Sequence, residues 1–169
     1  EGAYNGFAAA LSAEQVAQLE ADPDVASVRP DIILRASADT VPTGVRRTLA
    51  HRNAETNIGS GGSVDVDVAV IDSGVDVDHP DLNVAGGINC VAGEDSAAYD
   101  DVNGHGTHVA GTIGARDNGT GVVGVAPGAR IWSVRVLNED GAGSESDVMC
   151  GVQWVTDNAG TIEVANMSL

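Results

Sequence analysis

The sequence contains no lysine, and its eight basic residues, all arginine, stand against 25 aspartates and glutamates. The formal net charge is therefore −17 at pH 7. A surface with such an excess of negative charge repels phosphate groups, so nucleic acids and anionic membranes are not expected as partners. Long hydrophobic runs are also missing, since none approaches the roughly 18 residues that a membrane-spanning helix needs. The charge and the hydropathy pattern thus predict a protein that binds neither nucleic acid nor a membrane.

Cysteine is scarce as well, with only Cys90 and Cys150 present. The two are too few and too far apart for a zinc ribbon or a redox Cys-x-x-Cys pair, which leaves one disulfide or two buried thiols. At 169 residues, of which 43% are hydrophobic, the chain is long enough to bury one good core and does not have a disordered composition. We therefore expect one globular domain or slightly more.

Strand-like and helix-like patterns alternate from residue 66 onward. Strands are expected at residues 66–71, 84–91, 131–137 and 162–169, and helices at residues 105–115 and 146–158. This alternation predicts an α/β fold in which a doubly wound, mainly parallel sheet carries helices on both faces. The positions expected to pack closely or to face the core are Ala110, Gly111 and Gly114 in the first helix and Val148, Val152 and Val155 in the second.

Residues 1–38 form a unit of their own. Residues 4–11 are typical of a strand, and residues 25–28 and 32–34 favour extended structure again. Between them Ser12 and Gln15 form a capping box that opens a short helix. A unit this small cannot hold a hydrophobic core alone. The polar stretch from about residue 37 to residue 50 is expected to be a linker.

Two motifs have the clearest chemical meaning: VAVIDSG at residues 68–74 and NGHGTHVAG at residues 103–111. The first is an apolar strand that ends in Asp72, and the second places His105 at the start of a helix. A carboxylate at the end of a parallel strand can orient an imidazole as a general base. A turn role for Asp72 is the alternative. Zinc binding by His105 and His108 is disfavoured, because their spacing is not that of His-Glu-x-x-His, and we interpret His108 as structural.

Through these two motifs and residues 79–82 (HPDL), the chain resembles the subtilisin-type serine proteases, the subtilase family. The resemblance implies a serine endopeptidase that hydrolyses peptide bonds in proteins, with Asp72 orienting His105 as general base and acid. No Gly-Thr-Ser-Met-type motif is present, so the nucleophile and the oxyanion asparagine are expected beyond residue 169. Ser168 lacks the sequence context of a nucleophile and is rejected. The chain is identified as a subtilase fragment, with an incomplete subtilisin-type sheet, that would be inactive by itself.

Residues 1–38 resemble the C-terminal part of the subtilase propeptide, a small α+β domain of the ferredoxin-like type. The resemblance implies that this segment is an intramolecular inhibitor and chaperone, and that residues 39–169 are the N-terminal half of the catalytic domain. The junction is expected between Ala36 and Asp39. Because the family is mostly secreted, an extracellular location and a disulfide between Cys90 and Cys150 are also expected.

The stretch 116–127 contains G-x-G-x-x-G, but it follows a helix and leads to a strand, the reverse of the dinucleotide-binding order. It resembles the family's calcium-binding loop instead, and oxygen-rich loops with flexible glycines suit calcium. The resemblance implies side-chain oxygens from Asp81 and Asn118, backbone carbonyls from Arg116, Thr120 and Val122, and a further carboxylate from Asp39. A plain surface loop is the alternative.

The resemblance also indicates where a protein or peptide substrate would bind. Gly141, Ala142 and Gly143 match the strand that pairs with the substrate backbone, and Ser168 and Leu169 begin the opposite wall. A peptide between these walls would add as a β-strand. Two other classes of function stay open: a non-catalytic relative that keeps the fold as a binding module, and a dinucleotide-binding α/β domain, which the misplaced glycine motif weakens.

Overall fold

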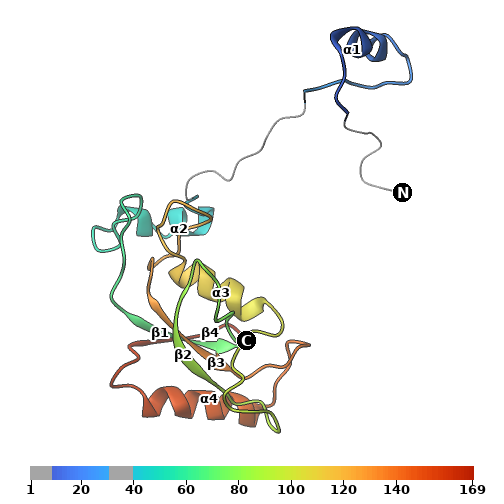
Figure 1. Ribbon diagram of the computed structural model, residues 1–169. Coiled ribbons are helices and arrows are strands. Elements are labelled where there is room, and N and C mark those ends of the chain that lie inside the picture. Colours follow the sequence, from blue (N-terminus) through green and yellow to red (C-terminus); the bar gives the residue numbers. More distant parts are fainter. Residues whose placement is uncertain (1–8, 31–39) are drawn as a thin grey trace. The chain divides into compact units, whose positions relative to one another are not determined.

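The computed structural model describes residues 9–30 and 40–169 (Figure 1). The chain divides into two compact units, Glu1–Arg35 and Ala36–Leu169. In the first unit, α1 spans Ala13–Glu20. The predicted capping box is present, because the backbone N–H of Gln15 donates to Ser12 Oγ and the backbone N–H of Ser12 donates to Gln15 Oε1. Residues 25–28 form no hydrogen-bonded strand. The strand expected at 32–34, and most of the one expected at 4–11, lie outside the described residues.

The second unit is built on a four-stranded sheet with the strand order β2-β3-β1-β4. The strands are β1 (Asp67–Asp72), β2 (Asn83–Asn89), β3 (Arg130–Arg135) and β4 (Val164–Met167). All pairings are parallel, and β1 lies between β3 and β4. Every residue of β1 is buried, as its continuous apolar run requires for a strand covered on both faces. The expected α/β fold with a parallel sheet is therefore confirmed.

Helices cover both faces of this sheet (Figure 1). They are α3 (His105–Gly114) and α4 (Glu145–Asp157). Because side chains alternate along a strand, Val68 and Val70 of β1 join the apolar cluster under α3, whereas Ala69 and Ile71 join the cluster under α4. The sheet is thus doubly wound, and Asp72 is the last residue of the buried strand β1, at its carboxyl end.

Two packing predictions need correction. A Cβ added at Gly111 would meet nothing within 4 Å, so this glycine is not needed for close packing. A Cβ added at Gly114 would lie 3.2 Å from a side chain of β3, so close packing is confirmed there. On α4, Val152 is 43% exposed and does not face inward. Gly151 takes that place, since a Cβ there would lie 2.7 Å from Val136 Cγ1. The helix packs too tightly on the sheet for a valine at this position, while Val148 and Val155 do contact the core.

The expected linker is partly helical, which corrects the sequence-based prediction. α2 spans Thr43–Arg47 and is followed by the short 3-10 helix η1, Ala50–Arg52. Val45 is only 2% exposed and Ala50 is also buried, so these two side chains anchor a stretch that is largely polar. Thr40 forms a parallel bridge with Val122, which ties the start of this segment to the loop after α3.

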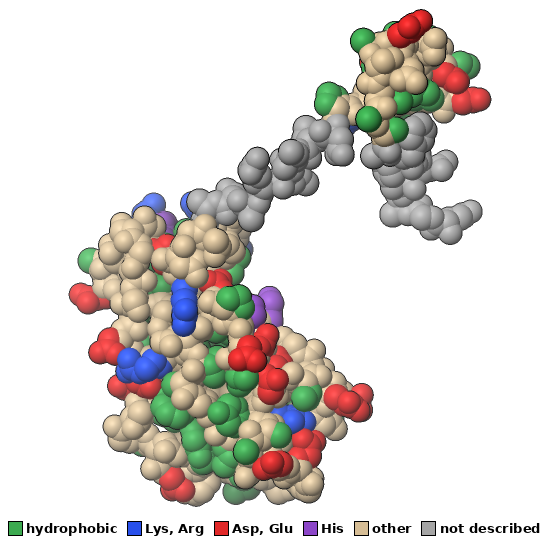
Figure 2. Space-filling view, in the orientation of Figure 1, with side chains coloured by type: hydrophobic (Ala, Val, Ile, Leu, Met, Phe, Trp, Pro, Cys, Tyr) green, Lys and Arg blue, Asp and Glu red, His purple; other side chains and the backbone are tan. Residues whose placement is uncertain are grey.

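Cys90 and Cys150 form a disulfide with Cα atoms 5.8 Å apart, which confirms the expected bond and ties the end of β2 to α4. Acidic side chains are spread over the visible face of the second unit (Figure 2). Within the two described ranges, no helix combines the length and the apolar character needed to cross a membrane.

Candidate active site

Asp72 and His105 meet at the carboxyl end of β1. The imidazole Nδ1 lies 2.8 Å from Asp72 Oδ1 and 2.9 Å from Oδ2. The carboxylate is fully buried, whereas half of the histidine side chain is exposed. An ionised carboxylate can only accept hydrogen bonds, so Nδ1 carries the proton and Nε2 of the neutral ring keeps a free lone pair. The geometry therefore orients a histidine that can take up a proton at Nε2.

Glycine is required where the end of the strand and the start of the helix come together. A Cβ added at Gly106 would lie 2.0 Å from the carbonyl oxygen of Gly74 and 3.1 Å from Asp72 Cβ. Gly74 itself has φ of 105°, a backbone conformation that side chains rarely allow. The glycines of both motifs thus permit the close approach that brings Asp72 and His105 within hydrogen-bonding distance.

The electrostatic environment favours the protonated imidazole. The hydrogen bond and then the negative charge of Asp72 raise the pKa of His105 above its ordinary value; desolvation opposes this, and the charge of Asp101 adds a smaller increase. A raised pKa means that the imidazolium ion is stabilised, which is what a general base needs once it has accepted a proton.

Asp101 is a carboxylate of this site that the sequence analysis did not single out. It stands in the loop before α3 and accepts a hydrogen bond from the hydroxyl of Ser73 at 2.8 Å. The available signal was an aspartate placed shortly before a helix whose N-cap residue, Gly104, has no side chain with which to cap it.

The segment expected to form one wall of the substrate cleft, Gly141–Gly143, lies in the exposed loop between β3 and α4. Asn138 shapes this loop, because its backbone N–H donates to the carbonyl of Ala142 and its Oδ1 accepts from the N–H of Ala142. Asn103 Nδ2 donates to the carbonyl oxygen of Glu139 at 3.0 Å. The loop is therefore fastened to the residues that immediately precede His105.

The residues expected to begin the opposite wall follow β4. Ile71 pairs with Met167 in parallel register, so Ser168, which follows β4, comes at the level of Asp72, the last residue of β1. Ser168 and Leu169 are exposed. The hydroxyl of Ser168 accepts a hydrogen bond from its strand neighbour Asn166 at 2.9 Å.

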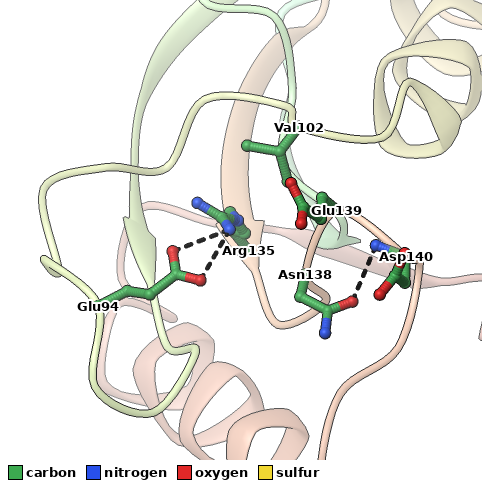
Figure 3. A pocket seen from close by; sticks show the side chains of 6 residues that line it. All are labelled: Glu94, Val102, Arg135, Asn138, Glu139 and Asp140. Carbon is green, nitrogen blue, oxygen red and sulfur yellow. Dashed lines mark hydrogen bonds and ion pairs between the residues drawn. The ribbon is translucent and has the colours of Figure 1, made fainter.

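A cavity of about 480 Å³ opens beside the loop after β3 (Figure 3). It is lined by Glu94, Val102, Arg135, Asn138, Glu139 and Asp140. The guanidinium of Arg135 is held 2.8 Å from Glu94, so these two charges neutralise each other and Glu139 and Asp140 leave the cavity acidic. Neither Asp72 nor His105 lines it, so this cavity is separate from the Asp72–His105 pair.

The expected calcium ligands are partly brought together. Asn118 Nδ2 donates to Asp81 Oδ1 at 2.8 Å, and the backbone N–H of Arg116 donates to the carbonyl of Asp81. The side-chain oxygen of Asn118 instead accepts hydrogen bonds from Thr120. Val122 lies in the same loop, and Asp39 falls outside the described residues. Residues 9–30 and 40–169 contain no cluster of three or more His, Cys, Asp or Glu side chains that could hold a metal ion.

The parallel sheet holds Asp72 where its carboxylate orients the imidazole of His105. The fold and this pair therefore define an α/β protein with a histidine that can accept a proton. Residues 63–169 match the model of the Subtilase family, and residues 1–37 match that of Peptidase inhibitor I9. The chain belongs to the subtilase family.

Its relatives include several bacterial proteases. Subtilisin E of Bacillus subtilis is 46% identical over 165 residues, which cover 98% of this chain and 42% of the relative. M-protease of Shouchella clausii is 46% identical over 159 residues, covering 94% and 40% respectively. Thermostable alkaline protease of Halalkalibacterium halodurans is 39% identical over 161 residues, covering 95% and 42%. The chain thus spans well under half the length of these curated relatives.

Proposed function

We propose that the protein is a serine endopeptidase that hydrolyses peptide bonds in proteins, with His105 as general base and acid and Asp72 as the residue that orients it. The hydrogen bond between His105 Nδ1 and the buried Asp72 carboxylate is the observation that carries this proposal. We place the serine nucleophile and the oxyanion asparagine beyond residue 169, in the part of the relatives that this chain does not span.

In this mechanism Nε2 of His105 removes the proton of the serine hydroxyl as its oxygen attacks the substrate carbonyl. Asp72 keeps Nδ1 protonated and stabilises the imidazolium that forms. The same Nε2 then returns the proton to the leaving amine nitrogen. The half-exposed position of the imidazole supports these steps, because the substrate and the serine must both reach Nε2.

We propose that the substrate backbone adds as a strand between Gly141–Gly143 and Ser168–Leu169, which the position of the first segment beside Asn103 supports. Residues 1–38 would act as an inhibitor and chaperone of residues 39–169, in line with their match to a peptidase inhibitor family. An extracellular location is supported by the disulfide, since such bonds persist in oxidising compartments.

We also propose that calcium binds at Asp81 and the 116–122 loop. The donor set fits in part: the carboxylate of Asp81 lies in hydrogen-bond contact with Asn118, and turning the amide of Asn118 end for end would present its oxygen in place of its nitrogen. The carbonyls of Arg116, Thr120 and Val122 would complete an oxygen set of the kind that calcium prefers, with Asp39 as a further candidate. A bound ion would supply a structural crosslink within this loop.

The test uses the full-length protein with its nucleophile and follows the hydrolysis of a protein substrate. We expect activity that serine-directed sulfonyl fluorides inhibit and that His105→Ala abolishes. His108→Ala is the matched control, since this exposed histidine lies one turn further along α3 and should leave the activity intact. Residues 1–169 alone should be inactive. A full-length protein that binds peptides but does not cleave them would favour the non-catalytic binding module instead.

A further inference from the structure

The carboxylate of Asp101 accepts several hydrogen bonds from the residues around His105. Its Oδ1 accepts from the hydroxyl of Ser73 at 2.8 Å and from the backbone N–H groups of Asn103 at 3.0 Å and Gly104 at 2.9 Å. Its Oδ2 accepts from both the backbone N–H, at 2.9 Å, and the hydroxyl of Thr107. Five donors from β1's tip, the loop and the first turn of α3 thus converge on one side chain.

Ser73 extends this hydrogen-bond network to Asp72. Its backbone N–H donates to Asp72 Oδ1 at 2.7 Å, and its hydroxyl accepts from the backbone N–H of Gly106 at 3.0 Å. Ser73 is fully buried, so no water competes for these bonds. The residues adjacent in sequence to Asp72 and to His105 are therefore both tied, directly or through one hydroxyl, to Asp101.

Asp101 is ionised at neutral pH. Burial opposes its ionisation, but hydrogen bonds from Thr107 and from backbone N–H groups at the helix start outweigh this and hold the pKa of its carboxyl below the ordinary value. Two carboxylates raise the pKa of the His105 imidazole: first Asp72 on β1, and then Asp101 from the loop before α3.

We infer that Asp101 is a positioning residue for the proposed reaction: it fixes Ser73 and the first turn of α3 so that His105 stays hydrogen-bonded to Asp72. The inference rests on the proposed function for its catalytic consequence, although the positioning itself is a property of the folded protein. A purely structural role is the competing explanation, because Asp101 also caps α3 in place of the side chain that Gly104 lacks. A cap alone would affect stability and leave the chemistry of His105 unchanged.

The test compares Asp101→Asn with Asp100→Asn in the full-length protein. Both variants remove one negative charge and nearly preserve side-chain shape, but Asp100 accepts from the N–H groups of Val77 and Asp101 and does not contact the helix start. An amide at position 101 turns an NH₂ group toward N–H donors, which breaks the network. We expect Asp101→Asn to lower kcat about tenfold or more with little change in KM, since small displacements of a reacting group are costly. Asp100→Asn should keep the kcat of the unmodified protein.

The pH profile supplies a second readout. Asp101→Asn lowers the pKa of His105 by removing a negative charge and by weakening the hydrogen bond to Asp72, whereas Ser73→Ala keeps the charge of Asp101 and changes only the positioning. A positioning role therefore predicts that the acid limb of kcat/KM shifts to lower pH in Ser73→Ala as well as in Asp101→Asn, and a cap alone predicts no shift in Ser73→Ala. The titration of the His105 imidazole, followed by NMR and assigned with His105→Ala, should show the same shift. This titration does not depend on catalysis. An inactive full-length protein would therefore refute the proposed function, while the NMR titration would still decide whether Asp101 positions His105.

Ser73→Ala covers the case in which Asp101→Asn does not fold. It removes one hydroxyl and leaves in place the hydrogen bonds that Thr107 donates to Asp101, so α3 stays capped. Its kcat should fall with KM nearly constant. If Asp101→Asn, or Ser73→Ala in its place, loses only thermal stability and keeps the kcat, pH profile and imidazole titration of Asp100→Asn, the positioning role is wrong.

Discussion

Replacing Gly106 by alanine tests whether the contact between the end of β1 and the start of α3 sets the catalytic geometry. The new methyl group would lie 2.0 Å from the carbonyl oxygen of Gly74, whereas real Cβ atoms essentially never come within 3.0 Å of such an atom. The first turn of α3 must therefore move away by at least about 1 Å. His105 begins this turn, so its hydrogen bond to Asp72, now 2.8 Å, lengthens to a distance at which it no longer holds the ring.

A misplacement of about 1 Å at a reacting group costs on the order of 100-fold in rate, so kcat of the full-length Gly106→Ala protein should fall by at least about that factor. Gly111→Ala is the control, because it makes the same substitution in the same helix where an added Cβ meets nothing within 4 Å. It should keep full activity and gain about 0.5–1 kcal/mol of stability from the better helix propensity of alanine.

The assay is the steady-state hydrolysis of a peptide substrate, normalised to the folded fraction measured by circular dichroism. Normalisation separates lost geometry from lost folding, since the clash at Gly106 also destabilises the protein. If a folded Gly106→Ala protein keeps the kcat of the Gly111→Ala control, the close approach does not position His105.

Three further outcomes are expected for the full-length protein. Replacing Cys90 and Cys150 by serine should remove up to about 4 kcal/mol from the free energy of unfolding in urea, because a crosslink over this span restricts the unfolded chain; an unchanged midpoint would contradict this. Calcium should raise the melting temperature through preferential binding to the folded form, and Asp81→Ala should remove that increase; no response in either protein would exclude the site. Since His105 must be neutral to act as a base and Asp72 raises its pKa, kcat/KM should fall as pH drops through a value above the ordinary histidine pKa, and Asp72→Asn should move that limb to lower pH.

Elements with a strong local pattern were predictable from the sequence. The buried apolar run before Asp72 and the capping box of α1 fix their own conformations, and both are present. The start of α4 shows the limit of such reading. The expected range began at residue 146, but Ser144 caps the helix together with Asp147, so the helix begins at Glu145.

Features that depend on packing between distant segments were not accessible in this way. The polar composition of the α2 segment predicts a linker, and the burial of Val45 and Ala50 explains why it is ordered. Val152 obeys the helical period yet points outward, because the sheet leaves room at that level only for Gly151. The role of Asp101 depends in part on the fold: its hydrogen bonds with Asn103, Gly104 and Thr107 are local, but the one from Ser73 joins residues 28 positions apart that only the fold brings together.

The central place of β1 has a consequence for how fast the chain folds. One partner strand follows β1 in the sequence by 63 residues and the other by 96, as the contacts of Asp67 with Arg130 and Glu163 show. Parallel pairings over such separations require long loops to close before any strand contact is gained, which makes folding slow even when the final sheet is stable. The rate-limiting event is therefore expected to be the assembly of β3 and β4 around β1. A segment that acts as a folding assistant would act most effectively by stabilising this assembly before the sheet is complete.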